Sequence, residues 1–340
     1  MRIGIIGLGG VGRALISLLV EKSDELITMG VSPEIVFALN SSSGCYREEG
    51  IDLKELLNHL ETSRDLSLLD GGFQGGDIHG LLDAANLDFL IEVTPTDKVT
   101  GEPALSHILS ALGMGVNVVT ANKGPVMLHY RRLKDLADTM GVSLGIGCTA
   151  GGALPTISSG QYDLLGARVT GIRGVLNGTT NYILTSMEEE GLEYIEALGK
   201  AQKEGIAETD PSMDVEGWDT AIKLIIIANA LMGSNLKLQD ARVEGIQNLK
   251  FEDVNKAIAQ EKKLKLIGKV QWEGNNWNLV VAPEAVDKND IFFSVNGKNK
   301  GIQYLTDTLG DIAVLGGASN LKGAAASLLR DLLQIWSKIN

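Results

Sequence analysis

The chain begins with a glycine-rich turn that lies between a short apolar strand and an amphipathic helix. The strand holds Ile3, Ile5 and Ile6, the pattern G-x-G-x-x-G spans residues 7–12, and the helix begins at Val11. The first glycine bends the chain tightly, the second lets the backbone approach a pyrophosphate, and the third packs the helix on the strand. Because the chain contains 41 glycines, it is the placement between strand and helix that predicts a dinucleotide-binding site. The expected cofactor contacts in this turn are Gly7, Leu8, Gly9, Gly10, Val11 and Gly12.

The end of the second predicted strand bears on which dinucleotide binds. This strand, residues 34–39, is followed by Asn40 and three serines. A cofactor with a free ribose 2′-hydroxyl usually meets Asp or Glu at this point, but the first acid here is Glu48, and Arg47 lies beside it. We therefore expect Asn40 to contact the cofactor, and the pattern favours NADP(H) over NAD(H). Residues 44–80 read as loop and short helices, to which the sequence assigns no role.

Two later strands end in residues suited to a ligand. The strand at 88–93 ends in Thr94, and the strand at 117–120 is followed by Ala-Asn-Lys-Gly-Pro, which contains Lys123. Ligands of open α/β sheets bind beyond the carboxyl ends of the strands, so Thr94 and Lys123 should face the cofactor. The alternative for Lys123 is a solvated loop lysine. The strand–helix alternation up to residue 146 predicts an α/β fold with an N-terminal, doubly wound, Rossmann-type parallel sheet.

The chain changes character after residue 150. Residues 168–176 alternate as a strand, and the following Asn-Gly-Thr-Thr-Asn, with Gly178 and Thr179, opens a helix whose start suits a carboxylate or an alcohol. Ordinary N-capping explains the same residues without a ligand. The alternating stretches 264–272 and 277–285 predict a hairpin, and hence an antiparallel or mixed sheet.

These patterns predict two domains. A dinucleotide-binding domain is expected over residues 1–150 and is completed by residues 305–340, whose helix is rich in alanine and leucine. Residues 151–304 are expected to form a second, α+β domain for substrate binding and dimerisation. Sheets of this kind often build subunit interfaces, so we expect a homodimer.

The stretch over residues 204–232 combines acids with a long apolar helix. Its acids come in a short run, namely Glu204, Glu208, Asp210 and Asp214. We expect Asp214 to cap a helix that runs to Met232. Asp219 and Lys223 fall on one face of that helix, where its buried part begins. A lysine facing acids at the edge of a core can bind a small zwitterion and polarise an oxygen. The alternative is a surface ion pair worth about 0.3–0.5 kcal/mol.

Composition limits the classes of function. The formal net charge of −13 argues against a nucleic-acid partner or a membrane partner. Two cysteines, Cys45 and Cys148, cannot build a disulfide framework and indicate a reducing cytoplasm. The sequence shows no secretory signal, no apolar run of the ~18 residues that a membrane span needs, and no Cys/His spacing typical of metal ligands. We expect a cytoplasmic enzyme with a small-molecule substrate and no metal.

The motifs together resemble those of the homoserine dehydrogenase family. In order along residues 7–224 they are GLGGVG, EVTPT, VVTANKGP, AGGALP, GVLNGTTNYIL and EGIAETDPSMDVEGWDTAIKL. The last two are long and distinctive, whereas residues 241–300 match no motif of the family. The resemblance implies a reversible, NAD(P)-dependent hydride transfer between L-homoserine and L-aspartate 4-semialdehyde, a step in threonine, methionine and isoleucine biosynthesis.

The resemblance also assigns roles to individual residues. Lys223 matches the family's proton donor or acceptor at the reacting oxygen, a role that suits a partly desolvated lysine beside Asp219. Lys123 matches the lysine between nicotinamide and substrate, so both lysines are expected to be catalytic. The implied substrate contacts are Glu208, Asp219, Asp214, Gly178 and Thr179. The implied cofactor contacts include Gly10, Val11, Thr94, Lys123, Gly205 and Gly316.

One family feature is missing from this chain. Members often carry a glutamate shortly before the AGG segment, which serves a monovalent cation together with backbone carbonyls, and Ile146 aligns with it here. We therefore expect packing of Ile146 and Leu154, rather than a metal, to hold this turn. The chain starts at the nucleotide-binding strand and stops at Asn340, so we expect a single-function form without a kinase or amino-acid-sensing domain.

Two rival functions remain open at this point. Another amino-acid or semialdehyde oxidoreductase could use the same two-domain plan, because fold does not prove substrate. A non-catalytic dinucleotide-binding sensor would keep the glycine turn. Such a sensor would have no reason to retain Glu208, Asp219 and Lys223 together.

Overall fold

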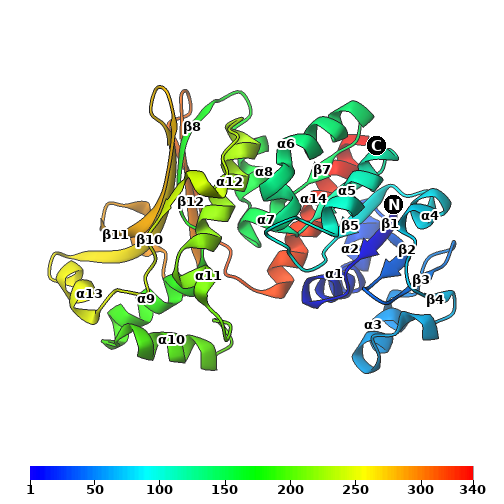
Figure 1. Ribbon diagram of the computed structural model, residues 1–340, viewed down its shortest axis with the longest axis horizontal. Helices are drawn as coiled ribbons and strands as arrows, with labels where there is room; N and C mark the ends of the chain where they lie inside the picture. Colours follow the sequence, from blue (N-terminus) through cyan, green and yellow to red (C-terminus); the bar gives the residue numbers. More distant parts are fainter. Residues whose placement is uncertain (340) are drawn as a thin grey trace. The chain divides into compact units, whose positions relative to one another are not determined.

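The computed structural model describes residues 1–339, and Asn340, the last residue of the predicted C-terminal segment, lies outside the described residues. The chain divides into two compact units (Figure 1). The first unit is formed by Met1–Thr149 together with Asn320–Asn340, and the second by Ala150–Ser319.

Within the described residues, the first unit holds a sheet of seven strands in the order β4-β3-β2-β1-β5-β6-β7. Its strands are β1 Arg2–Ile6, β2 Glu34–Leu39, β3 Ser43–Tyr46, β4 Gly72–Gln74, β5 Phe89–Glu92, β6 Asn117–Thr120 and β7 Leu144–Gly145. The pairs β1–β2, β1–β5, β5–β6 and β6–β7 are parallel. Because β2 and β5 flank β1 on opposite sides, the chain winds outward in both directions. The predicted doubly wound parallel sheet is therefore confirmed.

One edge of this sheet differs from the sequence-based expectation. Residues 44–80 were expected to be loop and short helices, but β3 and β4 extend the sheet there as antiparallel strands. The buried hydroxyl of Ser43 accepts a hydrogen bond from the backbone N–H of Leu66 at 2.9 Å and ties the edge to the following turn. These two strands are short and both contain glycine, so they show no alternation of apolar and polar residues from which a strand can be predicted.

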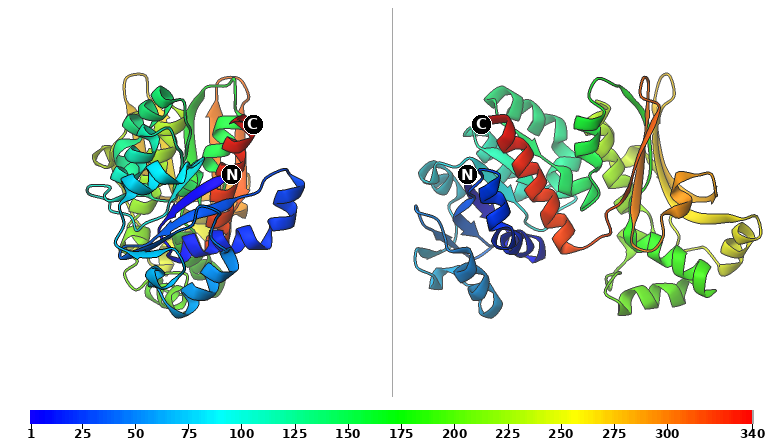
Figure 2. Two further views of the ribbon diagram at one scale, coloured as in Figure 1. Left: turned by 90° about the vertical axis from the view of Figure 1, so that its right-hand side faces the viewer. Right: turned by 180° about the vertical axis from the view of Figure 1, so that it is seen from behind.

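Helices cover both faces of the first unit's sheet. They are α1 Gly10–Glu21, α2 Ser23–Thr28, α3 Leu53–Thr62, η1 Leu66–Leu68, α4 Ile78–Ala85, α5 Ala104–Gly113, α6 Lys123–Met140, α7 Gly147–Gly151, which crosses into the second unit, and α14 Leu321–Ile339. One apolar core joins α1 and α14 to the sheet and includes Leu15 and Leu328. The other core joins α5 and α6 to it and includes Ile108 and Leu133. The C-terminal helix α14 lies beside α1 in both views (Figures 1 and 2), so residues from the two ends of the chain build one core.

The second unit is α+β, as expected. In the part of the chain that the structure describes, its sheet has six strands in the order β13-β12-β8-β10-β11-β9. They are β8 Val169–Val175, β9 Ala241–Val243, β10 Lys262–Trp272, β11 Trp277–Asp287, β12 Lys300–Thr306 and β13 Asp311–Gly316. All neighbouring pairs are antiparallel except β9–β11. The predicted hairpin is β10–β11, closed by Trp272 and Trp277, whose rings meet edge to face at 5.0 Å.

The helical segments of the second unit are α8 Thr156–Ser158, η2 Ser159–Asp163, α9 Gly178–Glu190, α10 Tyr194–Lys203, α11 Ser212–Val215, α12 Trp218–Leu231, η3 Leu238–Asp240, α13 Phe251–Ile258 and η4 Ile291–Ser294. Helix α12 is buried on all sides from Asp219 to Ala228. It packs on the sheet at Gly268, where an added Cβ would lie 2.4 Å from Leu224 Cδ1. The side chains at the start of α12 are therefore held in fixed positions.

The predicted single helix from Asp214 to Met232 is wrong. The structure divides it into α11 and α12, and Asp214 lies inside the short α11 instead of capping the long helix. Gly217 separates the two helices with φ +90°, a left-handed conformation that favours glycine. A Cβ at this position would lie 3.0 Å from Val243 Cγ1, so a larger residue would also crowd Val243.

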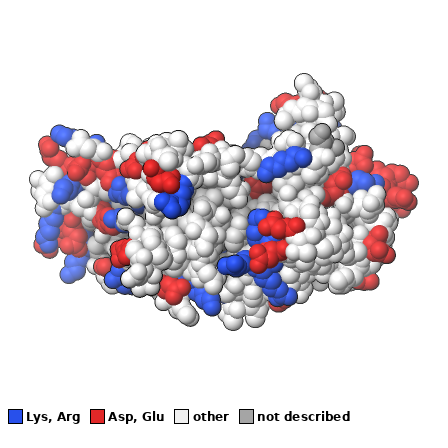
Figure 3. All heavy atoms as spheres, turned by 90° about the horizontal axis from the view of Figure 1, so that it is seen from above, with Lys and Arg blue, Asp and Glu red and all other residues white. Residues whose placement is uncertain are grey.

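The surface mixes charges of both signs. On the face drawn in Figure 3, Lys and Arg side chains lie among Asp and Glu side chains. Within residues 1–339, no helix combines the length and the apolar character that crossing a membrane requires.

Candidate functional site

The glycine turn between β1 and α1 leaves no room for side chains at two of its positions. Gly7 has φ +104°, and a Cβ there would lie 2.5 Å from the carbonyl oxygen of Val93. A Cβ at Gly12 would lie 2.2 Å from the carbonyl oxygen of Gly7. The first and third glycines thus serve the tight turn and the packing of helix on strand, as the pattern predicts.

The second glycine of the turn faces open space. A Cβ at Gly9 would meet no atom within 4 Å. Gly9 is also the N-cap of α1, and no side chain caps this helix start. Uncapped N–H groups at the positive end of a helix suit an anion, so the turn fits the pyrophosphate of a dinucleotide. The side chains of Leu8 and Val11 pack on the apolar core, which leaves their backbone for a cofactor.

Asn40 organises the turn after β2. Its Oδ1 accepts hydrogen bonds from the backbone N–H groups of Ser42 and Ser43, both at 2.9 Å, and its Nδ2 donates to the carbonyl of Arg64 at 2.6 Å. Arg47 forms a two-pronged ion pair with Glu55 at 2.7 and 3.0 Å. The Glu55 hydrogen bond raises the pKa of Arg47 above its ordinary value. Of the two observations that favoured a 2′-phosphate, the missing acid remains, whereas Arg47 is engaged with Glu55.

The ends of β5 and β6 are tied together by a buried carboxylate. Glu92, which is fully buried, accepts hydrogen bonds from the backbone N–H and the hydroxyl of Thr94. The Thr120 hydroxyl donates to the backbone carbonyl of Glu92 at 2.9 Å and lies 3.3 Å from the second carboxylate oxygen. The Nδ1 atom of His107 lies 3.7 Å from the carboxylate.

Asn122 connects the same two strand ends through the backbone. Its Nδ2 donates to the carbonyl of Thr94 at 3.1 Å, and its Oδ1 accepts from Gly124 N–H and caps α6. Lys123 is therefore the first residue of a capped helix, with its backbone fixed. Neither Glu92 nor Asn122 was predicted from the sequence, although a polar residue at the end of an apolar strand was an available signal.

In the second unit, Asp219 and Lys223 form an enclosed ion pair. Lys223 Nζ lies 2.6 Å from Asp219 Oδ2, and each side chain is 11% exposed. The same nitrogen donates to the carbonyl of Leu176 at 2.8 Å, at the end of β8. The alternative interpretation, a solvated ion pair on the surface, does not fit side chains that are this deeply buried.

Asn177 joins the two predicted substrate carboxylates. Its Nδ2 donates to Asp214 at 2.6 Å and to Asp219 at 2.9 Å, while its Oδ1 accepts from Thr180 N–H and caps α9. Burial, together with the negative charge of Asp219, raises the pKa of Asp214 above its ordinary value. From its sequence Asn177 is only a candidate N-cap, and its bridging role between the two carboxylates was not predicted.

The remaining predicted residues of the second unit lie at the start of α9, between α10 and α11, and at the end of β13. The Thr179 hydroxyl donates to the carbonyl of Ile206 at 3.2 Å, and a Cβ at Gly178 would lie 2.9 Å from the carbonyl of Lys298. Glu208 is exposed between α10 and α11, and its backbone carbonyl accepts from Gln202 at 3.1 Å. Gly205 and Gly316 both have positive φ and open space where a Cβ would stand.

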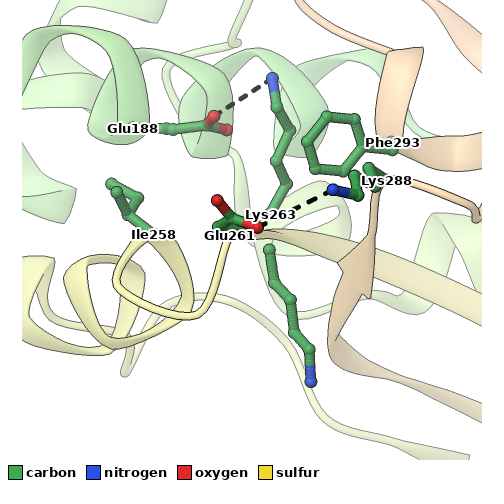
Figure 4. Close-up of a pocket in the computed structure, with 7 residues that line it drawn as sticks. Glu188, Ile258, Glu261, Lys263, Lys288 and Phe293 are labelled. Carbon is green, nitrogen blue, oxygen red and sulfur yellow. Dashed lines mark ion pairs between the residues drawn. The ribbon is translucent and has the colours of Figure 1, made fainter.

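A separate pocket of about 350 Å³ lies elsewhere in the second unit. It is lined by Glu188, Ile258, Glu261, Lys262, Lys263, Lys288 and Phe293. Figure 4 shows Lys263 directed at Glu188 and Lys288 at Glu261, with ion-pair distances of 3.1 and 3.9 Å. None of the predicted site residues lines it, and its charges largely compensate one another.

Comparisons with known proteins agree on one family. The family model described as homoserine dehydrogenase matches residues 155–333. A homoserine dehydrogenase from Methanocaldococcus jannaschii is 35% identical over 99% of both chains. A protein from Pseudomonas canavaninivorans named NAD(+)-dependent homoserine dehydrogenase is 32% identical over 98% of this chain and 96% of its own. A crystal structure of a provisionally named homoserine dehydrogenase from Archaeoglobus fulgidus has a TM-score of 0.88 and 32% identity, covering 99% of both chains.

Proposed function

We propose that this chain, which belongs to the homoserine dehydrogenase family, interconverts L-homoserine and L-aspartate 4-semialdehyde with NAD or NADP. The observation that carries the proposal is the enclosed Asp219–Lys223 pair, with Asn177 linking Asp219 to Asp214. A lysine nitrogen at 2.6 Å from a carboxylate and shielded from water can act on a substrate oxygen, while the acids can hold a substrate ammonium group.

Lys223 is the proposed acid and base. When semialdehyde is reduced, its carbonyl carbon gains a hydride and its oxygen gains a proton, which Lys223 donates. When homoserine is oxidised, the hydroxyl gives that proton back to Lys223 as the carbon loses the hydride. A bound nicotinamide supplies or accepts the hydride. Asp219 and the carbonyl of Leu176 orient the lysine nitrogen in both directions.

The substrate's ammonium group is the proposed partner of the acids. Asp214, Asp219 and Glu208 supply negative charge, and Asn177 holds the first two in a fixed arrangement. Gly178 and Thr179, at the start of α9, are proposed to contact the substrate carboxylate, because helix N-termini favour anions.

We also propose which residues of each unit contact the dinucleotide. In the first unit they are the glycine turn, Asn40, Thr94 and Lys123, with Lys123 also acting in catalysis. In the second unit they are Gly205 and Gly316. The missing acid at Asn40 supports use of NADP, which we propose as the slightly favoured cofactor, with NAD also accepted.

The roles of the two units follow from these assignments. We propose that the first unit binds the dinucleotide and that the second binds substrate and forms a homodimer through its sheet. A cytoplasmic location is part of the same proposal, because a chain of 340 residues with only two cysteines fits a reducing compartment.

A spectrophotometric assay tests the proposal. Purified protein is supplied with L-homoserine and with NAD or NADP in parallel, and reduced cofactor is followed. The reverse reaction uses L-aspartate 4-semialdehyde, with a phosphorylated analogue of the substrate as the control. Turnover of homoserine supports the proposal, whereas turnover confined to another semialdehyde, or dinucleotide binding without turnover, would overturn it.

A further inference from the structure

The glycine-containing segment at the start of the second unit is held by two buried side chains of one strand. Lys300 and Tyr304 lie four residues apart on β12 and so project from the same face. Lys300 Nζ donates to the carbonyl of Gly151 at 2.6 Å, and the Tyr304 hydroxyl donates to the carbonyl of Thr156 at 2.6 Å. Lys300 is 2% exposed and Tyr304 is fully buried. One strand therefore contacts the AGGALP segment at Gly151 and the residue that directly follows it, Thr156.

Close packing surrounds the lysine nitrogen. Gly152 has φ +56°, and a Cβ there would lie 3.5 Å from Lys300 Nζ. A Cβ at Gly317 would lie 2.6 Å from the backbone nitrogen of Leu154. The segment therefore follows a path that glycines permit and that Lys300 contacts directly.

The residues of this segment, and those just before it, do not fit the monovalent cation that the family resemblance implies. Ile146, at the position expected for a glutamate, has no side-chain oxygen, and its carbonyl already accepts from the Thr149 hydroxyl at 2.6 Å. The carbonyl of Gly151 accepts from Lys300. A metal cation bound to that same carbonyl would meet the positive charge of a buried lysine, and like charges repel strongly away from water.

We propose that the ammonium group of Lys300 takes the place of the monovalent cation at this turn. A primary ammonium supplies one positive charge and hydrogen-bond donors to carbonyl oxygens, which is what a sodium or potassium ion would offer the same backbone. Because Lys300 is covalently part of β12, the turn keeps its cation at any salt composition.

Melting temperature in different chloride salts tests this proposal. The wild type and Lys300→Ala are compared in sodium, potassium, ammonium and choline chloride at constant ionic strength. We expect the wild-type melting temperature to be the same in all four salts. Lys300→Ala should melt on the order of 5 °C lower in choline chloride, because the buried Gly151 carbonyl loses its donor. Potassium or ammonium should then restore part of that loss in a saturable way, by entering the vacated space.

Control variants separate charge from packing. Lys298→Ala removes an exposed lysine two residues away and should behave like the wild type in every salt. Lys300→Met keeps the length of the side chain and loses the charge, so it should melt lower than the wild type without a response to cations, because the space remains filled.

Three results would overturn the proposal. They are a saturable sodium or potassium effect on the wild type, a Lys300→Ala variant as stable as the wild type in choline chloride, and a destabilised Lys300→Ala variant that no cation restores. The wild-type titration decides the question even where a variant fails to fold. Melting temperature is measured without substrate, so the outcome is independent of whether homoserine is turned over.

Discussion

Lys223 lies one helical turn after Asp219 on α12, and their charged atoms are 2.6 Å apart with only 11% of each side chain exposed. Helix α13 carries a pair with the same spacing, Glu252 and Lys256, at 3.0 Å, but those side chains are 73% and 63% exposed. Sequence spacing is therefore the same in both pairs, and burial distinguishes them. An exposed pair contributes about 0.3–0.5 kcal/mol, whereas a buried pair is costly to break.

Replacement of Lys223 by alanine should lower turnover by about 10²–10⁴-fold, the usual contribution of a positioned acid or base. Dinucleotide binding, followed by fluorescence or calorimetry, should remain. Lys223→Arg should not restore turnover, because the guanidinium stays protonated and differs in shape. Lys256→Ala serves as the matched control and should keep full activity. A folded Lys223→Ala variant with near-normal turnover would reduce the residue to a structural ion-pair partner.

Asn40→Asp should shift cofactor preference towards NAD. The carboxylate retains an acceptor for Ser42 and Ser43 N–H but adds a negative charge where a 2′-phosphate is expected. We expect kcat/KM with NADP to fall by about 10-fold more than kcat/KM with NAD, since like charges repel. Asn40→Ala removes the acceptor without adding charge and should affect both cofactors alike. Equal losses with both cofactors in Asn40→Asp would refute the proposed role of this position.

Glu92→Gln should weaken cofactor binding by disturbing the strand ends. One oxygen of the Glu92 carboxylate accepts from both the backbone N–H and the hydroxyl of Thr94, and an amide could place its NH₂ group there or offer a weaker acceptor. Losing a charge-assisted hydrogen bond in a buried site should raise the KM for dinucleotide by about 10-fold or more. The pH dependence of kcat should stay unchanged, because Glu92 only positions Thr94. Glu61→Gln, on the exposed side of α3, is the control, and an unchanged cofactor KM in Glu92→Gln would remove the positioning role.

Asp331 predicts a pH-dependent stability. Burial raises the pKa of this carboxyl to about 6, although its hydrogen bond from Gly147 N–H opposes the shift. The folded state therefore binds more protons than the unfolded state between the unfolded pKa of about 3.9 and the folded pKa. Stability from this group is full at lower pH and is lost as pH rises to about 6.

Asp331→Asn removes this titratable carboxyl. The difference in stability between the variant and the wild type therefore reports the contribution of the carboxyl at each pH. The variant's free energy of unfolding, relative to wild type, should increase from pH 4 to pH 7 by on the order of 2–3 kcal/mol. Chemical denaturation at several pH values measures it, with the exposed Asp83→Asn as the control. A stability difference that stays constant across this range would contradict the shifted pKa.

The features that could be predicted from the sequence are those determined by residues close together in the chain. The glycine turn at residues 7–12 and the β10–β11 hairpin depend on neighbours in the chain, so their patterns identify them. The left-handed turn at Gly217 packs against Val243, and the bridging role of Asn177 depends on Asp214 and Asp219. Contacts between residues that are distant in sequence leave no periodic signal, which is why these features were missed.

The contacts that Lys300 and Tyr304 make around the AGGALP segment could not be predicted from the sequence for the same reason. A lysine at the start of an apolar strand suggests an exposed side chain. No residue near Lys300 in the sequence indicates that its nitrogen contacts the carbonyl of Gly151. The sequence shows that acids are frequent in this stretch. It does not show that Glu208 is exposed while Asp219 is buried, which only the fold reveals. Sequence therefore predicted the chemical classes of the site better than the contacts between its members.

The placement of α14 has a consequence for how the protein is made. The core that includes Leu15 of α1 also contains Leu328 and Leu332, which leave the ribosome only after the whole second unit. During synthesis the first 149 residues therefore lack the part of this core that α14 supplies, although most of their own secondary structure can form. Nascent chains that stop before residue 320 should be recognised as incomplete by chaperones and proteases. We therefore expect chains that include α14 to resist proteolysis better than chains that stop before residue 320.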